Sequence, residues 1–590
     1  MRLGEAFGEQ STQTLRRAAV TFRPAVAGQG RRLAGCAALA LVTVALELLR
    51  PWPIKVLFDR ILITDGPAQG IWGFSPETSL LVLAASVLAI SLLIGAVSLR
   101  MTVLAAEVGR KATTRVRRQV FAHLHRLDLP FHQSSRTGDL LVRLMGDVNM
   151  VRDMLFASWL TLLERGTLLV GTAVVMLVLD PLLALVALIP LPVLWWALGR
   201  SSRKLKDITR KQRRREGAAA AFASESLQQI RLVKAYAAEE RTTDSFARQA
   251  GAGERASLKS ARITAKMSWI TEALTGAGLA LVLLVGSRKV LRAEISVGEL
   301  LVFISYARSV YKPLRKLSSE GGRLSKATAC AGRLLEVLDI RPEEASSGRS
   351  AMAFDGDVEL RDVRYRYPEN GVEALRGLSF RLPAGTLAVL SGPNGSGKST
   401  TVSMLLRLVS PDSGQVLIDG HDAAEFRLDE YRNRFAYVPQ DVLLFGVSIR
   451  DNILYGRPDA DDTAVHRAAE LALVDDVIER VGGYDAMLGE NGATLSGGEA
   501  RRLMLARAAV RDARIVLLDE PLAGVDPHAR TLVAQAIRRI AAGRTTIVVN
   551  HGPAEEIAPD AMINLADGRL LPPVRRRTAT GATLSRRPST

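Results

Sequence analysis

Residues Gly392–Thr400, with the sequence GPNGSGKST, combine three glycines with a lysine and hydroxyl side chains. They fit the pattern G-x-x-x-x-G-K-[ST], in which a tight turn points its backbone N–H groups at phosphate oxygens. In this pattern we expect Lys398 to reach the β- and γ-phosphates and the Ser399 hydroxyl to ligate Mg²⁺. Residues 386–391 predict a buried strand before the turn, and a helix whose N-terminus attracts anions follows it. The segment therefore predicts binding of a nucleoside triphosphate.

A run of apolar residues ends in two carboxylates at residues 515–520, with the sequence IVLLDE. Such a run is typical of a buried parallel strand whose C-terminal end faces a ligand. Asp519 is suited to the Mg²⁺ shell, either directly or through water. Glu520 is suited to polarising the attacking water, because a carboxylate near the γ-phosphate can accept its proton. This run therefore adds hydrolysis to the predicted nucleotide binding.

A third segment, residues 495–499 with the sequence LSGGE, precedes an apolar and basic run that predicts a helix. Ser496 and the two following glycines offer a hydroxyl and backbone N–H groups at the start of that helix. This is a second place where an anion can bind a helix N-terminus. One active site rarely needs two such places from a single chain, so we infer an interface between two nucleotide-binding domains.

The composition favours a membrane protein with more than one domain. The chain has 590 residues, of which 48% are hydrophobic, and its mean hydropathy is +0.13. A net charge of +18 fits nucleic acid or an anionic membrane surface, and the basic residues beside apolar segments favour the membrane. Cys36 and Cys330 are the only cysteines, so neither a disulfide framework nor a zinc site is expected. The polar, Arg-bearing first thirty residues do not predict a cleavable signal peptide.

Apolar runs separated by basic segments predict six membrane spans. The spans are expected at about 33–52, 78–99, 157–179, 182–198, 268–286 and 297–312. Basic residues after the second and fourth spans place those sides, and both termini, in the cytoplasm. Arg288, Lys289 and Arg292 disagree with this topology, because they fall in a loop that it sends outside. The alternative is that the fifth helix ends early and the count differs.

The fold class predicted is multi-domain. Residues 1–32 form a basic cytoplasmic lead-in and residues 33–317 an all-α six-helix transmembrane domain with long cytoplasmic helices. A polar linker at 318–353 leads to an α/β P-loop nucleotide-binding domain at 354–572. The tail at 573–590 has the composition of a disordered segment.

Together these motifs resemble those of ABC transporters, and the chain looks like an exporter-type half-transporter, a membrane domain fused to its own ATPase. The resemblance is highly specific over about residues 360–555 and weaker over about 30–320. It implies ATP and Mg²⁺ as cofactors. The metal-site residues that it implies are Ser399, Gln440 and Asp519. The nucleotide-binding residues that it implies are Tyr367, Gly392, Asn394, Gly395, Ser396, Gly397, Lys398, Ser399, Thr400, Ser496, Gly497, Gly498 and Asp526.

The resemblance also implies roles for the remaining motif residues. Glu520 matches the catalytic glutamate, and His551 the switch histidine that holds the γ-phosphate and Glu520 in register. Gln440 matches the Q-loop residue that senses Mg²⁺ and the water. Asp526 falls in the D-loop. Tyr367 matches the aromatic residue that stacks on adenine, although Tyr365 is close by and either could be a core residue.

In this family ATP is held between the phosphate loop of one subunit and the LSGGE-type signature of the other. Ser496 and Gly498 are therefore expected to cap the partner's γ-phosphate. Two positions depart from the family's pattern: Glu499 replaces the commoner Gln, and Gly552 follows His551 where a basic residue is often found. Because the catalytic Glu520 and His551 are both present, a homodimer is favoured over a heterodimer with another half-transporter.

Three stretches of the helical part also resemble this family. Residues 131–139 and the region after 225–236 look like its coupling helices, and residues 51–58 look like the end of its first span. Without the ATPase motifs, solvated amphipathic helices would explain all three.

The function predicted is ATP-driven export by alternating access, with a lipid, drug-like or peptide substrate, at an inner or plasma membrane. Import of a metal chelate by the same architecture is the first alternative. A soluble ABC ATPase acting on nucleic acid would explain the charge, but the uncharged span at about 78–99 argues against it. A membrane ATPase that moves nothing is a third possibility. Ionisable residues in or near the spans are Glu47, Glu164, Arg165, Glu272 and Arg308.

Overall fold

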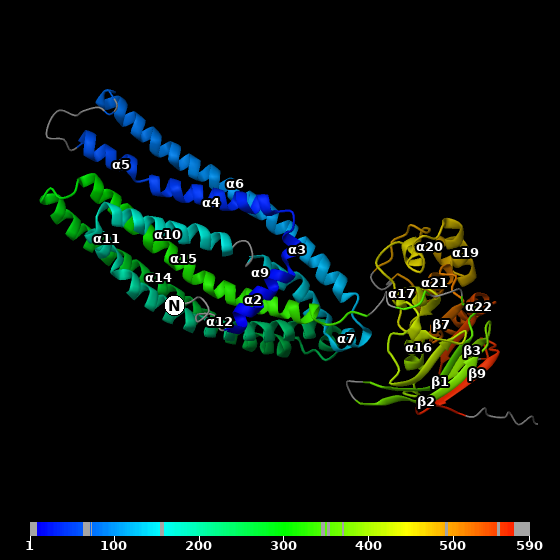
Figure 1. Ribbon diagram of the computed structural model, residues 1–590. Coiled ribbons are helices and arrows are strands. Elements are labelled where there is room, and N and C mark those ends of the chain that lie inside the picture. Colours follow the sequence, from blue (N-terminus) through cyan, green and yellow to red (C-terminus); the bar gives the residue numbers. More distant parts are fainter. Residues whose placement is uncertain are drawn as a thin grey trace, which may run out of the picture. The chain divides into compact units, whose positions relative to one another are not determined.

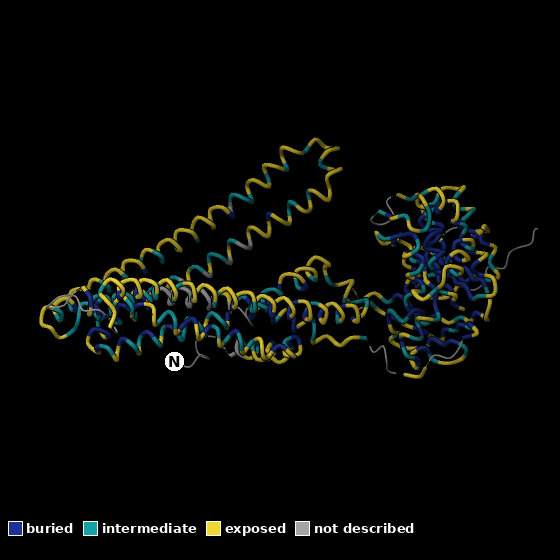
Figure 2. Tube along the Cα trace, turned by 90° about the horizontal axis from the view of Figure 1, so that it is seen from above, coloured by how far each residue is buried: buried dark blue, intermediate teal, exposed yellow. Residues whose placement is uncertain are grey.

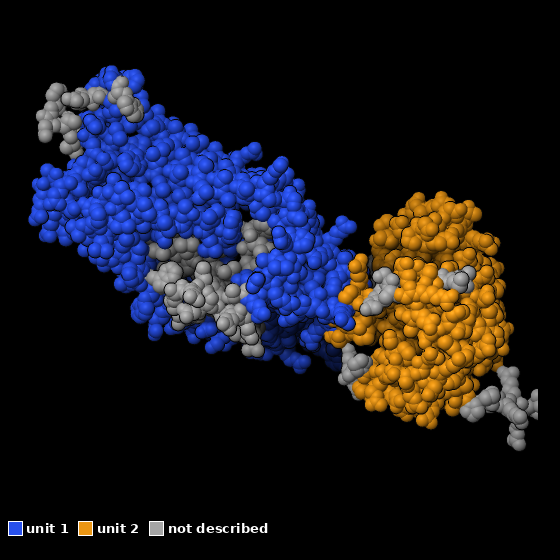
Figure 3. All heavy atoms as spheres, in the orientation of Figure 1, with its two compact units in different colours: residues 1–125, 135–341 blue, residues 126–134, 342–590 orange. Residues whose placement is uncertain are grey.

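The computed structural model describes residues 9–62, 71, 73–153, 158–343, 348–350, 354–367, 371–489, 494–551 and 555–571. The predicted tail and Gly552 lie outside these residues. The chain divides into two compact units, residues 1–125 with 135–341 and residues 126–134 with 342–590 (Figure 3). The described part of the first unit is helical and the second carries the strands. The predicted order of a helical unit followed by an α/β unit is confirmed.

Long helices build the first unit (Figure 1). Within it α4 packs beside α6, α10 beside α15, and α12 beside α14. Its helices are α2 (Glu9–Thr21), α3 (Arg23–Val26), α4 (Gly30–Leu49), α5 (Trp52–Leu57), η1 (Phe58–Leu62), α6 (Pro76–Leu124), α8 (Thr137–Val142), η2 (Arg143–Asp147), α9 (Val148–Arg152), α10 (Trp159–Leu179), α11 (Pro181–Leu188), α12 (Pro190–Gln228), α13 (Ile230–Ala235), α14 (Glu239–Leu291) and α15 (Val297–Leu338).

Five helices among the described residues are long and apolar enough to cross a membrane. They are Gly30–Leu62, Pro76–Leu124, Trp159–Leu179, Pro181–Ser201 and Glu239–Leu291, which contain or overlap the first five predicted spans. The sixth predicted span lies in α15, where Glu299, Arg308 and Lys312 interrupt the apolar residues, and it stays a prediction. Figure 2 shows long stretches of these helices exposed, as expected of apolar surfaces that face lipid.

Several helices continue far beyond the length that a bilayer requires. At about 1.5 Å per residue, some 20 residues span the hydrocarbon core, whereas α6 has 49 residues and α14 has 53. These extensions agree with the long helices predicted between the spans. One predicted boundary differs from the structure: α15 runs on to Leu338, so residues 318–338 of the predicted linker are helical.

Side-chain caps explain where several helices begin. The Asp180 carboxylate accepts a hydrogen bond from Leu183 N over 2.9 Å, and Pro181 supplies a fixed φ in the first turn of α11. Ser296 and Glu299 form a reciprocal capping box at the start of α15. Polar side chains therefore define where α11 and α15 begin.

The basic residues that disagree with the predicted topology end α14. The alternative of an early helix end is wrong, because α14 continues to Leu291. Lys289 pairs with Asp180 at the junction of α10 and α11, and its Nζ lies 3.7 Å from a Glu294 oxygen. A structural pairing therefore accounts for at least one of these three cations.

Two sheets form the α/β unit. The larger has the order β10-β9-β3-β8-β7-β6 and is parallel except for β10, and the smaller is antiparallel with the order β2-β1-β4-β5. The strands are β1 (Val358–Arg366), β2 (Glu373–Leu382), β3 (Leu387–Ser391), β4 (Ser413–Ile418), β5 (His421–Asp422), β6 (Phe435–Val438), β7 (Ile515–Asp519), β8 (Thr545–Asn550), β9 (Ala561–Ala566) and β10 (Arg569–Leu570). The helices are α7 (Leu129–Ser134), α16 (Lys398–Leu405), η4 (Ala423–Glu425), α17 (Leu428–Arg432), α18 (Ile449–Leu454), α19 (Asp462–Ala472), α20 (Asp475–Val481), α21 (Gly497–Val510) and α22 (Pro527–Ala541).

The parallel register of the large sheet brings the chemical motifs to one edge. Every residue of β7 and β8 is buried, as expected of parallel strands covered on both faces. Ser391 pairs with Asn550, and Asp519 pairs with Val549, so β3, β7 and β8 end together. The segments that follow these strands therefore meet at the carboxyl edge of the sheet.

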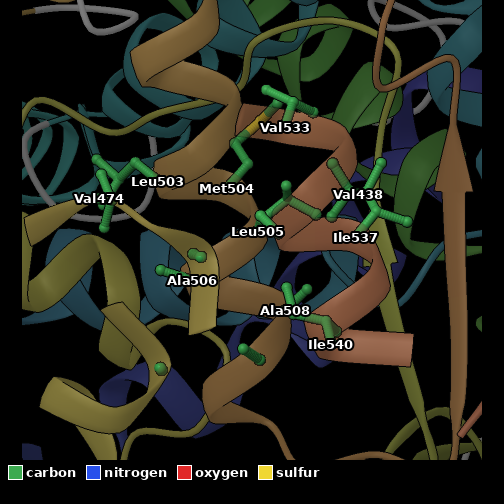
Figure 4. Packing of buried hydrophobic residues seen from close by; sticks show 14 of the residues in the cluster. Val438, Val474, Leu503, Met504, Leu505, Ala506, Ala508, Val533, Ile537 and Ile540 are labelled. Atoms are coloured by element: carbon green, nitrogen blue, oxygen red, sulfur yellow. The ribbon is translucent and has the colours of Figure 1, made fainter. Parts of the chain in front are cut away.

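The core on one face of this sheet centres on α21 and α22. Leu505 of α21 and Ile537 of α22 are fully buried, and they lie near Val438 of β6 (Figure 4). Nearly all of α21 is buried, including residues on opposite sides of the helix. The start of α21, which carries the LSGGE segment, is therefore held by a packed core.

Candidate functional site

The loop between β3 and α16 needs glycine at defined positions. Gly397 has a φ of +98°, and a Cβ there would lie 2.7 Å from the carbonyl oxygen of Ala374. A Cβ on Gly392 would lie 2.2 Å from the carbonyl oxygen of Leu565. Both positions therefore exclude a side chain, which explains their glycines in physical terms.

Lys398 lies inside this loop with 5% of its surface exposed. Its ammonium donates to the carbonyl oxygens of Gly392 and Pro393 over 2.9 and 2.8 Å. Burial lowers the pKa of Lys398, while the carboxylates of Glu520 and Asp519 raise it. A cation held in a loop of backbone N–H groups is suited to bind the negative charge of a nucleotide's phosphates.

Ser399 and Asp519 lie side by side, as the sequence predicts. The Ser399 hydroxyl donates to Asp519 Oδ1 over 3.4 Å. Burial raises the pKa of the Asp519 carboxyl, and the hydrogen bond from Ser399 opposes that shift. A hydroxyl and a carboxylate are oxygen ligands that suit Mg²⁺, which usually keeps waters and phosphate oxygens as its other ligands. In the described part of the chain no cluster of three or more His, Cys, Asp or Glu could hold a metal by itself.

Glu520 lies between Gln440 and His551. Gln440 Nε2 donates to one carboxylate oxygen over 2.8 Å, and His551 Nε2 contacts the other. Glu520 is 9% exposed and has a φ of +49°, a left-handed conformation that is strained for a residue with a side chain. The three side chains come from the segments after β6, β7 and β8. The sheet therefore assembles a carboxylate with a hydrogen-bond partner on each oxygen.

These groups line one cavity of about 760 Å³. The residues that line it are Tyr367, Val372, Ala374, Asn394, Gly395, Gly397, Lys398, Ser399, Thr400, Gln440, Glu520 and His551. Ten of these twelve belong to the site predicted from the sequence. The cavity joins a cationic loop, a metal-binding hydroxyl and a hydrolytic carboxylate, which is the arrangement that phosphoryl transfer requires.

Of the two aromatic candidates for stacking on a base, Tyr367 is the better placed. Its hydroxyl lies 3.0 Å from Thr400 Oγ1, and it lines the cavity. Tyr365 is 5% exposed in the core, and its ring packs edge-on against Tyr367 at 5.1 Å.

Seven predicted site residues do not line the cavity of this chain. Gly392 and Ser396 belong to the phosphate loop, Asp519 ends β7, and the other four lie at the starts of α21 and α22. Ser496, Gly497 and Gly498 begin α21, and Asp526 caps α22 by accepting from Ala529 N over 3.0 Å. A Cβ on Gly498 would lie 2.5 Å from the Ala529 Cβ, so packing against α22 also requires this glycine. The site in one chain therefore lacks its predicted second anion-binding element.

The structure adds Arg501, which the sequence analysis missed. Its guanidinium donates to the backbone oxygens of Glu520 over 3.1 Å and Ala523 over 2.8 Å. Burial lowers the pKa of Arg501, whereas the Glu520 carboxylate raises it. The only signal in the sequence was the place of this arginine, one turn into a helix rich in apolar residues.

Comparison with known proteins gives the family. Residues 33–314 match the family described as "ABC transporter transmembrane region", and residues 375–523 match "ABC transporter". An ATP-dependent lipid A-core flippase of Chromohalobacter salexigens is 31% identical over 79% of this chain and 81% of its own length. This chain belongs to the ABC transporter family. A multidrug efflux ATP-binding/permease protein of Mycobacterium bovis is 32% identical over 79% of this chain but only 39% of its own length.

The fold is that of an ABC exporter. A solved bacterial Atm1-family ABC exporter with ATP bound matches with a TM-score of 0.78 and 27% identity, covering 92% of this chain and 95% of that one. The predicted fusion of a membrane domain with its own ATPase is confirmed. The ABC transporter therefore couples ATP hydrolysis to transport, with ATP and Mg²⁺ as its cofactors. The alternative of a soluble ATPase is wrong, because residues 33–314 match the transmembrane region.

Proposed function

We propose that this ABC transporter works as a homodimer with two identical hydrolytic sites. The observation that carries the proposal is the division of the site: Lys398, Glu520 and His551 line the cavity, whereas Ser496 and Gly498 start a helix outside it. A second copy, turned to face the first, would add the N-terminus of its α21 to each cavity. Both sites would then contain the same catalytic groups, so a different partner is not needed.

Each group in the cavity has a chemical task in this proposal. The loop amides and Lys398 bind the β- and γ-phosphates, and Tyr367 stacks on the adenine. Ser399 and Asp519 would hold Mg²⁺, and the bound metal would supply neutralisation of the phosphate charge. Gln440 donates to the Glu520 carboxylate and would join Ser399 and Asp519 in holding the metal, so it would register when ATP is in place.

Hydrolysis needs a base aligned with the attacking water. Glu520 orients that water and accepts its proton, and the contacts from Gln440 and His551 fix its carboxylate. His551 would also help to hold the γ-phosphate when ATP is bound. ATP favours the closed dimer because only that state supplies both anion-binding elements, and loss of the γ-phosphate opens it again.

The substrate class that we propose is an amphiphilic lipid or drug-like molecule moved outward across an inner or plasma membrane, with both termini in the cytoplasm. Relatives with about a third of their residues identical include a lipid flippase and a multidrug efflux protein by name. Within the spans, Arg165 pairs with Glu164 at 3.0 Å and lies 3.9 Å from Glu47. Arg308 and Glu272 are exposed on α15 and α14, so they are the ionisable candidates for substrate contact.

The test is transport by the chain purified alone in lipid vesicles. Fluorescent phospholipids and a lipophilic dye are each followed across the bilayer, with ATP and with a non-hydrolysable analogue. ATP-dependent movement that is absent in Glu520→Gln supports export by a homodimer. ATP hydrolysis without movement of either probe would contradict the proposed substrate class, and inward movement would contradict the direction.

A further inference from the structure

The fifth residue of the LSGGE segment is charged where glutamine is common in this family. Glu499 lies in the first turn of α21, the helix end proposed to face the ATP held by a second copy. A carboxylate is favourable at a helix N-terminus. It also repels an approaching phosphate, so this position needs a balancing charge when ATP arrives.

Both oxygens of the Glu499 carboxylate are occupied. Oε2 accepts a hydrogen bond from the backbone N–H of Ser496 over 2.8 Å, and Oε1 lies 2.8 Å from Arg480 Nη2. The Ser496 hydroxyl in turn accepts from the backbone N–H of Glu499 over 3.3 Å. Because that hydroxyl already accepts a hydrogen bond, its own hydrogen can be donated to a ligand oxygen.

Arg480 reaches this site from a different helix. It lies in the last turn of α20, and its side chain is 52% exposed, whereas that of Glu499 is 21% exposed. Exposed ion pairs of this kind add little to folding stability because water screens them. The pair is better explained by its position, since it places a cation on the carboxylate that flanks Ser496.

We propose that Arg480 is a positioning residue for the second half of the ATP site. It neutralises Glu499 and holds the capping box, so that the Ser496 hydroxyl and the N-terminus of α21 meet the γ-phosphate without repulsion. This inference rests on the proposed homodimeric ATP site. In this chain Arg480 and Glu499 together leave no net charge beside Ser496, as the commoner Gln does alone elsewhere in the family.

The test compares Arg480→Met, its combination with Glu499→Gln and a matched control in ATPase assays in lipid nanodiscs. Arg480→Met leaves Glu499 uncompensated, and we expect the KM for ATP to rise about tenfold, the size of effect that one partly screened charge produces. The kcat is expected to change less, because Glu520 and His551 are untouched. Glu499→Gln combined with Arg480→Met is expected to restore the KM, and raising the salt concentration is expected to shrink the difference between Arg480→Met and the wild type.

Arg361→Met serves as the matched control. Arg361 pairs with Glu359 at 2.6 Å on β1, with side-chain exposures of 59% and 19% that resemble those of the Arg480 pair. Thermal unfolding of every variant shows whether any of them is misfolded. We expect Arg361→Met to keep the wild-type KM.

Two results would overturn the inference alone: a wild-type KM in Arg480→Met, or a raised KM that Glu499→Gln does not restore. The second result would mean that Arg480 acts through the packing of α20. ATPase activity that survives in Glu520→Gln would instead overturn the proposed site, and this inference with it.

Discussion

Arg501 donates a hydrogen bond to the backbone oxygen of Glu520 over 3.1 Å. The same guanidinium holds the carbonyl of Ala523, in the segment that leads to α22. Glu520 has a left-handed backbone conformation, which costs free energy. Contacts with neighbouring groups must offset that cost. Arg501 belongs to α21, so the helix that starts with the LSGGE segment is tied to the hydrolytic residue of its own chain. In the proposed dimer, each chain's α21 would serve the opposite site while contacting its own catalytic residue.

Replacing Arg501 with Gln is expected to lower kcat more than it changes the KM for ATP. The shorter neutral side chain cannot reach both carbonyls, so Glu520 loses its alignment while the phosphate loop stays intact. A loss of about tenfold to a hundredfold is in the range of misplaced catalytic groups. Steady-state ATPase kinetics measure this, with Arg539→Gln, an exposed arginine bonded to the carbonyl of Glu470, as the control. An unchanged kcat in Arg501→Gln would contradict the positioning role.

Replacing Gly397 with Ala is expected to abolish tight ATP binding. The added Cβ meets the Ala374 carbonyl and keeps an unfavourable positive φ, which together cost about 1–3 kcal/mol or more. Gly385→Ala is the matched control, because Gly385 has a φ of +77° with open space around it. A fluorescence assay measures ATP binding by each variant, and thermal unfolding shows whether either substitution also destabilises the fold. Equal loss of ATP binding in both variants would mean that the positive φ, and not the contact of the Gly397 Cβ with the Ala374 carbonyl, causes the loss.

Removing Lys289 is expected to destabilise the helical unit. Asp180 would remain mostly buried without its cation, since its side chain is only 9% exposed. A cost of about 2–3 kcal/mol is reasonable for a broken pair at this depth. Asp180→Asn in the Lys289→Ala background should recover most of the loss, because Asn removes the charge and still caps α11. Thermal unfolding in detergent tests this, and a loss that Asn does not recover would contradict a charge-based cause.

Replacing Tyr367 with Ala is expected to weaken ATP binding about tenfold, the lower part of the range for loss of a base-stacking contact. Tyr367→Phe should bind nearly as well as the wild type, because the ring remains and only the hydroxyl contact with Thr400 is lost. Equilibrium titration with a fluorescent ATP analogue distinguishes the variants. Similar weakening in Ala and Phe would assign the effect to the hydroxyl, against the stacking role.

Local patterns were enough to name most of the residues that line the cavity. The loop at Gly392–Thr400 and the strand ending at Asp519 depend on short runs of residues whose geometry follows from their own sequence. The roles of Arg501 and Arg480 could not be predicted from local patterns. Their contacts with Glu520 and Glu499 depend on how α20 and α21 pack. The capping box of Ser496 and Glu499 was within reach, since S-x-x-E before an apolar run is a known helix start.

In the membrane domain, too, some features follow from the local sequence and others depend on tertiary packing. Uncharged runs such as residues 78–99 predicted spans directly, and α6 contains that run. The continuation of α15 to Leu338 was missed because it has no continuous apolar run, although Cys330, Leu334 and Val337 recur at helical spacing and are buried. The pairing of Lys289 with Asp180 joins residues far apart in sequence, so no local rule could reveal it.

The most direct test of the central claim is ATPase activity of the chain purified alone in lipid nanodiscs, measured beside Glu520→Gln. We predict steady hydrolysis in the wild type and a loss of at least a hundredfold in the variant, with ATP binding preserved in both. Binding without hydrolysis in the wild type would contradict a self-sufficient homodimer and would point to a second, different half-transporter. Hydrolysis that persists in Glu520→Gln would contradict the assignment of Glu520 as the catalytic carboxylate.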